Sequence, residues 1–209
     1  MDKKILVETS AHHIHVTQEV LELLCGKGAQ LECIKELSQP GQFASQVRLD
    51  VVYHAEIKDR KTGEIVKKDN VLKGLRILGP VRKENQVEIS LTEARSLKAN
   101  VPVRESGDVK GTPGCTLVNP ENGNSVDIDC GMIVAKRHIH MTPEDAKEFG
   151  VENGQIVNVK ISEGLGRDAI LGDVVIRVSP KYALAMHIDT DECNALGGGS
   201  SEVYGIIVD

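Results

Sequence analysis

The chain has 209 residues and a formal net charge of −6 at pH 7, a length that allows one large domain or two small ones with proper hydrophobic cores. The acidic balance and the scarcity of aromatic side chains, with two Phe, three Tyr and no Trp, argue against a nucleic-acid partner. The five cysteines show no C-x-x-C spacing, which is typical of reduced thiols in an intracellular protein. There is no apolar run of membrane-spanning length and no recognisable signal peptide, so we expect a cytoplasmic protein that does not act at a membrane.

The first half of the sequence predicts short strands and two short helices. Apolar residues recur at helical spacing between Gln18 and Cys25, and Gly26 ends that pattern. The charged segment 58–68 has a Thr-Gly pair at its middle, which predicts an exposed hairpin inserted into this half. In chain order we expect a strand at 4–10, a helix at 18–25, strands at 47–51, 71–78 and 86–90, and a helix at 92–97.

The second half repeats this mixture after a loop at 105–114 that holds three glycines and a proline. This loop is the best boundary candidate, so we predict a first domain at 1–104 and a second at 115–209. We expect strands at 132–135, 157–161, 169–178 and 203–208, helices at 143–149 and 190–195, and turns at 164–166 and 197–199. Many short strands with few helices predict a mainly β fold with short helices, arranged as small β-barrels.

A His-x-His pair occurs twice in a chain that has only seven histidines. The pairs are His13 with His15 and His138 with His140. Residues i and i+2 of a strand project from the same face, so each pair directs two imidazoles into one small volume where a cation could bind both. A threonine two residues after each pair begins a helix pattern, which places each pair beside a helix N-terminus. The alternative is strand histidines without a ligand role, which the second copy disfavours.

The two halves also agree beyond these pairs. Gly79-Pro80 is followed by Glu88-Ile89-Ser90, and Ser179-Pro180 is followed by His187-Ile188-Asp189. When the isoleucines are superimposed, Glu88 falls opposite His187, and both residue types ligate zinc. Alone, Glu88 would be interpreted as a solvated carboxylate and His187 as a core histidine. Each ion would have three protein ligands and a free position, as in catalytic zinc sites, although Co²⁺, Mn²⁺ and Fe²⁺ are also compatible. The predicted ligand sets are His13, His15 and Glu88 for one ion and His138, His140 and His187 for the other.

Arg82 lies just after Gly79-Pro80 and six residues before Glu88. If the chain turns back into a strand there, the guanidinium could face the metal site and clamp a phosphate through two parallel hydrogen bonds. The alternative is an ordinary solvated loop arginine. Arg137 directly precedes His138 and would normally point to the opposite face of its strand, so it is the weaker candidate.

With these residues in view, the chain resembles the PduL-type phosphotransacylases, also called phosphate propanoyltransferases, from about residue 5 to residue 208. The resemblance implies two related β-barrel domains with two zinc ions in an active site between them. It implies the reversible reaction acyl-CoA + phosphate ⇌ acyl phosphate + CoA, with the same six metal ligands and with Arg82 contacting phosphate. The matching motifs are Ser10-x-x-His13-Ile14-His15, Gln39-Pro40-Gly41-Gln42-Phe43-Ala44, Gly79-Pro80-Val81-Arg82, Gln86-Val87-Glu88-Ile89-Ser90, Pro102-Val103-Arg104-x-Ser106-Gly107-Asp108 and Arg137-His138-Ile139-His140-Met141-Thr142-Pro143.

The chain departs from the family pattern at three places. The family usually has Asn-Arg before the first His-x-His, where this chain has Ala11 and His12; His12 could replace that arginine or add a ligand. The stretch between Ala44 and Gly79 is longer than usual and contains the predicted hairpin. The N-terminal amphipathic segment of microcompartment enzymes is absent, which indicates a free cytoplasmic enzyme acting on acetyl-CoA or a similar short acyl thioester.

The sequence thus predicts a phosphate acyltransferase whose small-molecule partners are acyl-CoA and phosphate. No Ser or Cys sits in a nucleophile motif, so we expect direct transfer without an acyl-enzyme. One alternative is a zinc-dependent thioester or phosphoester hydrolase, because an open metal position can also activate water; another is a non-catalytic metal-binding protein. The CoA-contacting residues, the acyl chain, the native metal and the existence of a homo-oligomer are left open.

Overall fold

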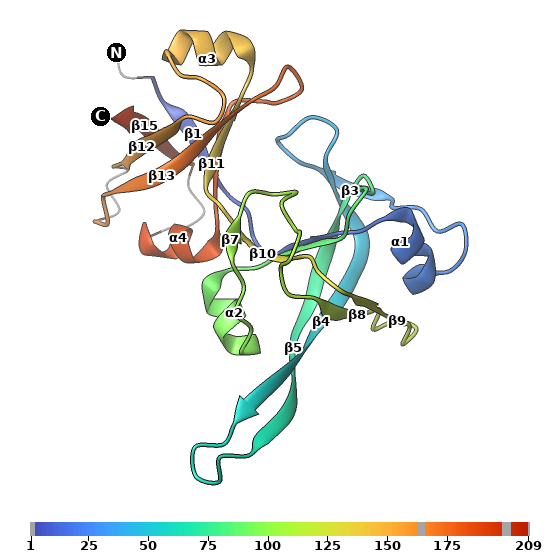
Figure 1. The fold of residues 1–209 in the computed structure, drawn as a ribbon. Helices are drawn as coiled ribbons and strands as arrows, with labels where there is room; N and C mark the ends of the chain where they lie inside the picture. The colour runs from blue at the N-terminus through green and yellow to red at the C-terminus, as the bar shows by residue number, and fades with distance from the viewer. Residues whose placement is uncertain (1–2, 163–165, 198–201, 209) are drawn as a thin grey trace. The chain divides into compact units, whose positions relative to one another are not determined.

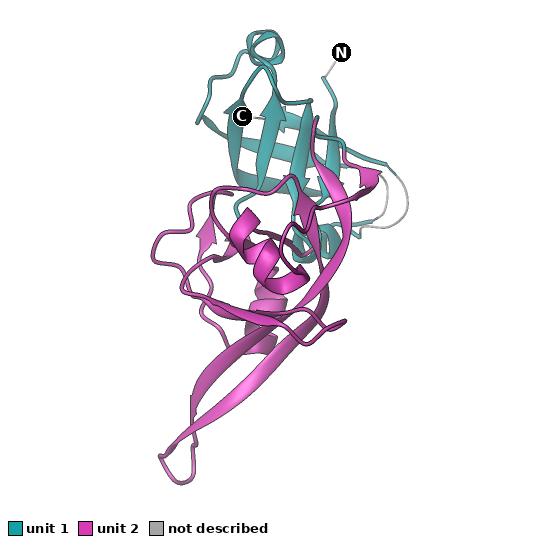
Figure 2. Ribbon diagram, turned by 90° about the vertical axis from the view of Figure 1, so that its right-hand side faces the viewer, with its two compact units in different colours: residues 1–11, 38–40, 135–209 teal, residues 12–37, 41–134 magenta. Residues whose placement is uncertain are grey.

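The computed structural model describes residues 3–162, 166–197 and 202–208. Two compact units, shown in Figure 2, are each built from separate stretches of chain. Unit 1 contains residues 1–11, 38–40 and 135–209, and unit 2 contains residues 12–37 and 41–134. The first strand of the chain therefore belongs to the unit formed mainly by the C-terminal part of the sequence. The predicted division into halves at 1–104 and 115–209, joined by the 105–114 loop, stays a prediction.

Unit 1 is a closed six-stranded barrel in the order β1-β14-β11-β13-β12-β15. Its core is aliphatic, with Ile5, Ile139 and Ile176 fully buried, because alternate residues of each strand point inward. The strands and helices are β1 Ile5–Thr9, β11 His138–Met141, α3 Pro143–Phe149, β12 Ile156–Ile161, β13 Ala169–Val178, β14 Ala185–Ile188, α4 Thr190–Ala195 and β15 Val203–Val208.

Unit 2 is a curled sheet in the order β7-β10-β6-β2-β5-β4-β8-β9, with β3 paired to β4. Strands β4 and β5 are long and continue past the sheet as the hairpin at the bottom of Figure 1, as predicted for 58–68. The elements are β2 His13–His15, α1 Gln18–Cys25, β3 Cys33–Glu36, β4 Phe43–Lys58, β5 Ile65–Gly79, β6 Gln86–Glu88, α2 Leu91–Leu97, β7 Val103–Arg104, β8 Cys115–Val118, β9 Ser125–Ile128 and β10 Met132–Ala135.

The same three-strand frame occurs in both units. In unit 2, β2 pairs antiparallel with β6 and parallel with β5. In unit 1, β11 pairs antiparallel with β14 and parallel with β13. Each frame also has a fourth strand: β10 pairs parallel with β6 in unit 2, and β1 pairs parallel with β14 in unit 1. The internal repeat seen in the sequence is therefore a repeat of strand topology.

The helices begin where side chains complete the hydrogen bonding of the first turn. Thr142 accepts a hydrogen bond from the backbone N of Asp145 (3.1 Å), and the Asp145 carboxylate accepts one from the backbone N of Thr142 (2.9 Å). Reciprocal pairs of this kind also start α2 and α4. Each helix is thereby fixed directly after a strand of the frame.

The predicted mainly β fold with short helices and β-barrel architecture is confirmed. The predicted active site between two domains stays a prediction. The predicted turns at 164–166 and 197–199 lie partly outside the described residues. None of the helices in the described part of the chain has the length and apolar character needed to cross a lipid bilayer.

Candidate active site

The first His-x-His pair and Glu88 form one cluster of side chains in unit 2. Strand register places His13 directly opposite Glu88 across the β2–β6 pair, and His15 lies two residues further along β2, on the same face. All three are buried, with 6%, 2% and 8% of their surfaces exposed. One ligand atom from each lies within 4.8 Å of the others, so the group can surround a single small cation.

Glu88 is held by a hydrogen-bond network that sequence analysis did not identify. Its Oε1 atom accepts hydrogen bonds from Gln86 Nε2 (2.6 Å) and Ser106 Oγ (3.0 Å). Ser106 Oγ in turn accepts from Arg82 Nη1 at 3.3 Å, and Gln86 Oε1 accepts from the backbone N of Gly107 at 2.6 Å. The 105–107 loop thus connects the Arg82 guanidinium to the Glu88 carboxylate within unit 2.

The charge states in this group suit cation binding. Burial by itself would raise the pKa of the Glu88 carboxyl, but the neighbouring His13 and His15 and the Ser106 hydroxyl bring that pKa below its ordinary value. Burial lowers the pKa of the His15 imidazole well below its ordinary value, with further lowering from His13 and Arg82. The Nδ1 of His15 donates to the carbonyl of Leu78 (3.2 Å), which leaves Nε2 available as a ligand atom.

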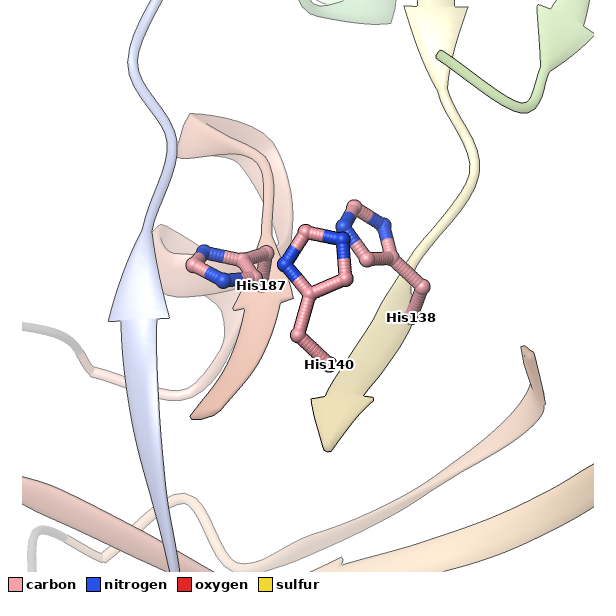
Figure 3. A group of neighbouring side chains, drawn as sticks. All are labelled: His138, His140 and His187. Carbon is pink, nitrogen blue, oxygen red and sulfur yellow. The ribbon is translucent and has the colours of Figure 1, made fainter. Parts of the chain in front are cut away.

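The second group consists of three histidines in unit 1. Figure 3 shows the rings of His138 and His140 on β11 beside the ring of His187 on β14. His138 pairs with His187 in the strand register, as His13 pairs with Glu88 in unit 2, and the ligand atoms again lie within 4.8 Å of one another. The Nδ1 of His138 donates to the carbonyl of Lys136 at 2.9 Å, an outer contact typical of metal-ligating histidines.

His140 provides the observation that tests whether a metal fits. Its two ring nitrogens are buried, and neither has a hydrogen-bond partner among the described residues. Burial, followed by the neighbouring His138, His187 and Arg177, lowers the pKa of His140 to about 2, so the imidazole is neutral near pH 7. A buried polar atom without a partner costs free energy, and a coordinated cation would remove that cost at the nitrogen it binds. Three imidazoles, or two imidazoles and a carboxylate, form a donor set that suits Zn²⁺.

The ring of Tyr182 covers one face of His140. The ring centroids are 4.0 Å apart and the planes are inclined by 24°, and the Arg177 guanidinium carbon lies 6.0 Å from the centroid of Tyr182. Since neither ring nitrogen of His140 has a hydrogen bond among the described residues, its ring is positioned by packing, to which this stacking contributes together with the rings of His138 and His187. Nothing in the spacing of the sequence identified Tyr182.

Comparison with known proteins now decides the family. The family model described as phosphate propanoyltransferase matches residues 6–198. A phosphate propanoyltransferase of Enterococcus faecalis is 49% identical over 191 residues, which cover 91% of this chain and 82% of that protein. One from Thermotoga maritima is 46% identical over 191 residues (91% and 83%), and one from Listeria monocytogenes is 44% identical over 197 residues (94% and 84%).

The chain belongs to the phosphate propanoyltransferase family. The predicted resemblance is thereby confirmed, and with it the class of enzyme, an acyltransferase. In this family member the six residues predicted as ligands are brought together in two groups of three. Arg82 lies next to the first group through Ser106.

The two residues that directly precede the histidine pairs are not part of either group of candidate metal ligands. His12, at the position of the usual arginine, contacts Glu93, and Arg137 forms an ion pair with Glu192. The sequence did contain a signal for part of the network: Gln86 and Ser106 belong to quoted family motifs, although their contacts with Glu88 could not be inferred from spacing.

Proposed function

We propose that the chain catalyses reversible transfer of a short acyl group between CoA and inorganic phosphate, using two zinc ions. The proposal is supported by one observation above all: a phosphate propanoyltransferase family member contains two three-donor groups, one buried and one partly buried, on the two copies of a repeated strand frame. His13, His15 and Glu88 would hold one ion, and His138, His140 and His187 the other.

The chemistry needs an electrophilic carbonyl carbon and a stable thiolate leaving group. A bound zinc ion supplies Lewis-acid polarisation of an oxygen and stabilisation of a developing negative charge. The chain itself keeps the donor side chains in the protonation states that bind a cation. The lowered pKa values of His15 and His140 keep these imidazoles neutral, and the lowered pKa of Glu88 keeps its carboxylate anionic.

Arg82 would bind the phosphate. Its guanidinium stays charged throughout the accessible pH range and can present two parallel N–H donors to a phosphate. The hydrogen bond to Ser106 restrains one terminal nitrogen, so part of the entropy of ordering the side chain is lost before substrate binds. A positioned phosphate is a far better nucleophile than a freely diffusing one.

We expect direct transfer. An oxygen of phosphate forms a bond to the carbonyl carbon, the C–S bond breaks, and CoA leaves as the thiolate, so no covalent acyl-enzyme is required. Two of the five cysteines are poorly suited to form an acyl-enzyme: burial raises the pKa of the Cys115 thiol to about 12 and raises that of Cys25 as well, which keeps both protonated and poorly nucleophilic.

The test is phosphate-dependent thiol release from acetyl-, propionyl- and butyryl-CoA, measured before and after treatment with a chelator and after readdition of Zn²⁺. We expect release only with phosphate present, loss of activity on chelation and recovery with metal. Release of thiol without phosphate would favour the hydrolase alternative, since a metal-activated water would then be the nucleophile. Stoichiometric labelling of the chain by radiolabelled acyl-CoA without phosphate would contradict direct transfer.

A further inference from the structure

The residue before each His-x-His pair contacts a glutamate of the same unit. In unit 1, Arg137 Nε lies 2.6 Å from Glu192 Oε1. In unit 2, His12 Nδ1 contacts Glu93 Oε1. Arg137 and His12 hold equivalent positions, directly before His138 and His13, and Glu192 and Glu93 are the equivalent residues of α4 and α2.

The second oxygen of each glutamate is also used, and it connects to the opposite strand of the frame. Glu192 Oε2 accepts a hydrogen bond from the backbone N of Asp189 at 2.9 Å, two residues after His187. Glu93 Oε2 accepts one from the backbone N of Ser90 at 2.9 Å, two residues after Glu88. One carboxylate thus joins the start of the strand that carries two ligands to the end of the strand that carries the third.

These contacts are unlike ordinary surface ion pairs. The side chains of Arg137 and Glu192 are 29% and 18% exposed, and those of His12 and Glu93 are 36% and 22% exposed. Exposed pairs contribute little because solvent screens them and both side chains must be ordered. Here one partner is already ordered by its capping hydrogen bond, so the other side chain meets a fixed carboxylate. The arrangement occurs twice, with an arginine in one copy and a histidine in the other.

We propose that Glu192 and Glu93 are positioning residues that each hold the three ligands of one metal group at the separation a cation requires. The proposal rests on the metal binding in the proposed function. Neither glutamate is among the six ligand residues; each acts through Arg137 or His12 and through the helix start. Outer contacts of this kind typically change metal affinity by about 10- to 100-fold when they are removed.

The experiment measures zinc affinity by chelator competition on the metal-free full chain, with the visible spectrum of bound Co²⁺ as a second readout of ligand geometry. Glu192→Gln removes the charge of the pair while keeping a side-chain oxygen that can still accept the capping hydrogen bond. We expect about 10-fold or greater weakening of one of the two zinc sites and a changed Co²⁺ spectrum. Glu93→Gln should weaken the other site.

Matched controls remove one exposed glutamate from the first turn of the helix that follows each histidine pair. Glu144→Gln in α3 and Glu19→Gln in α1 make the same charge change at exposed positions and should leave both zinc affinities unchanged. Arg137→Gln and His12→Ala change the partners of the two glutamates. Neither Arg137 nor His12 caps a helix, so these variants test the proposal even if the glutamate variants fold poorly. His12→Arg should retain the affinity that His12→Ala loses.

The outcomes separate this inference from the proposed function. If the unaltered chain binds zinc and the variants of Glu192, Glu93, Arg137 and His12 bind it with the same affinities, the positioning role is wrong while the proposed function stands. A lowered unfolding temperature of the metal-free variants with unchanged zinc affinities would reduce both glutamates to helix caps and likewise overturn the inference. If the unaltered chain bound no divalent metal, both proposals would fail.

Discussion

Arg82 is the residue on which phosphate recognition depends in the proposed function. Arg82→Ala removes the guanidinium and its hydrogen bond to Ser106. We expect a raised phosphate KM and a lowered kcat, together about 2–4 kcal/mol in kcat/KM if the contact strengthens in the transition state. Steady-state kinetics with varied phosphate at saturating acyl-CoA measure both parameters. Arg95→Ala, at an exposed position of α2, is the control, and a normal phosphate dependence of Arg82→Ala would remove Arg82 from the site.

Tyr182 should matter for metal affinity although it supplies no ligand. Tyr182→Leu removes the ring that stacks on His140 at 4.0 Å, so that fewer contacts hold the imidazole in its orientation. Aromatic pairs are worth about 0.5–1.5 kcal/mol beyond burial, which predicts zinc binding weakened about 2- to 10-fold. Tyr182→Phe keeps the stacked ring and should bind zinc as the unaltered chain does. Equal affinities of the Leu and Phe variants, measured by chelator competition, would contradict this role.

At the scale of elements, the quoted motifs around Phe43 and Gly79 are joined by a contact between β4 and β5. Phe43 pairs with Gly79 in the strand register, and a Cβ at Gly79 would overlap the ring of Phe43. Gly79→Ala should therefore destabilise the chain by about 1–3 kcal/mol, because the ring must leave its place at the end of β5. Chemical denaturation measures this change.

Gly172→Ala in β13 is the matched control, since its Cβ would meet only the flexible side-chain oxygen of Asn158 at 3.2 Å. We expect that variant to stay within about 0.5 kcal/mol of the unaltered chain. Combining Gly79→Ala with Phe43→Leu should restore part of the lost stability. If Gly79→Ala were as stable as Gly172→Ala, the close packing of the two motifs would be wrong.

The elements themselves were largely predictable from local signals. The helix at Gln18–Cys25 has the predicted bounds, because a capping threonine, four apolar residues at helical spacing and a terminal glycine all lie within nine residues of one another. The sequence did not predict that β1, at the N-terminus, pairs with β14 and belongs to unit 1. Strand alternation reports which face is buried and carries no information on which distant strand is the neighbour.

The candidate site shows the same limit. The six donor residues could be selected from the His-x-His spacing and the repeat, since strand geometry brings i and i+2 together. Ser106, Tyr182 and Glu192 could not be placed, because their contacts span 18, 42 and 55 residues of chain to Glu88, His140 and Arg137. The local sequence pattern therefore predicts the candidate ligands, whereas the contacts that orient them can be identified only in the folded chain.

For the whole molecule, the buried histidines make the stability of the metal-free chain depend on pH. The pKa of His140 is lowered to about 2 in the folded chain, against about 6.5 in the unfolded chain. Between these values the unfolded state binds a proton that the folded state does not, so stability is lost as pH falls below about 6.5. The cost is about 1.4 kcal/mol per pH unit, or about 2 kcal/mol from His140 at pH 5. The lowered pKa of His15 acts in the same direction.

Comparing His140→Gln with the unaltered chain between pH 7 and pH 5 separates the His140 contribution from that of Asp189 and Glu192, whose raised pKa values act in the opposite direction. The low pKa of Glu88 in the folded chain stabilises it above the unfolded value of about 4.3, and that contribution is lost only at lower pH. Urea denaturation of the chelator-treated chain at several pH values measures the slope, and His140→Gln should reduce the loss between pH 7 and pH 5 by about 2 kcal/mol. Parallel pH profiles for His140→Gln and the unaltered chain would mean that folding does not lower the pKa of His140, and the burial of a neutral imidazole ready for metal ligation would lose its support.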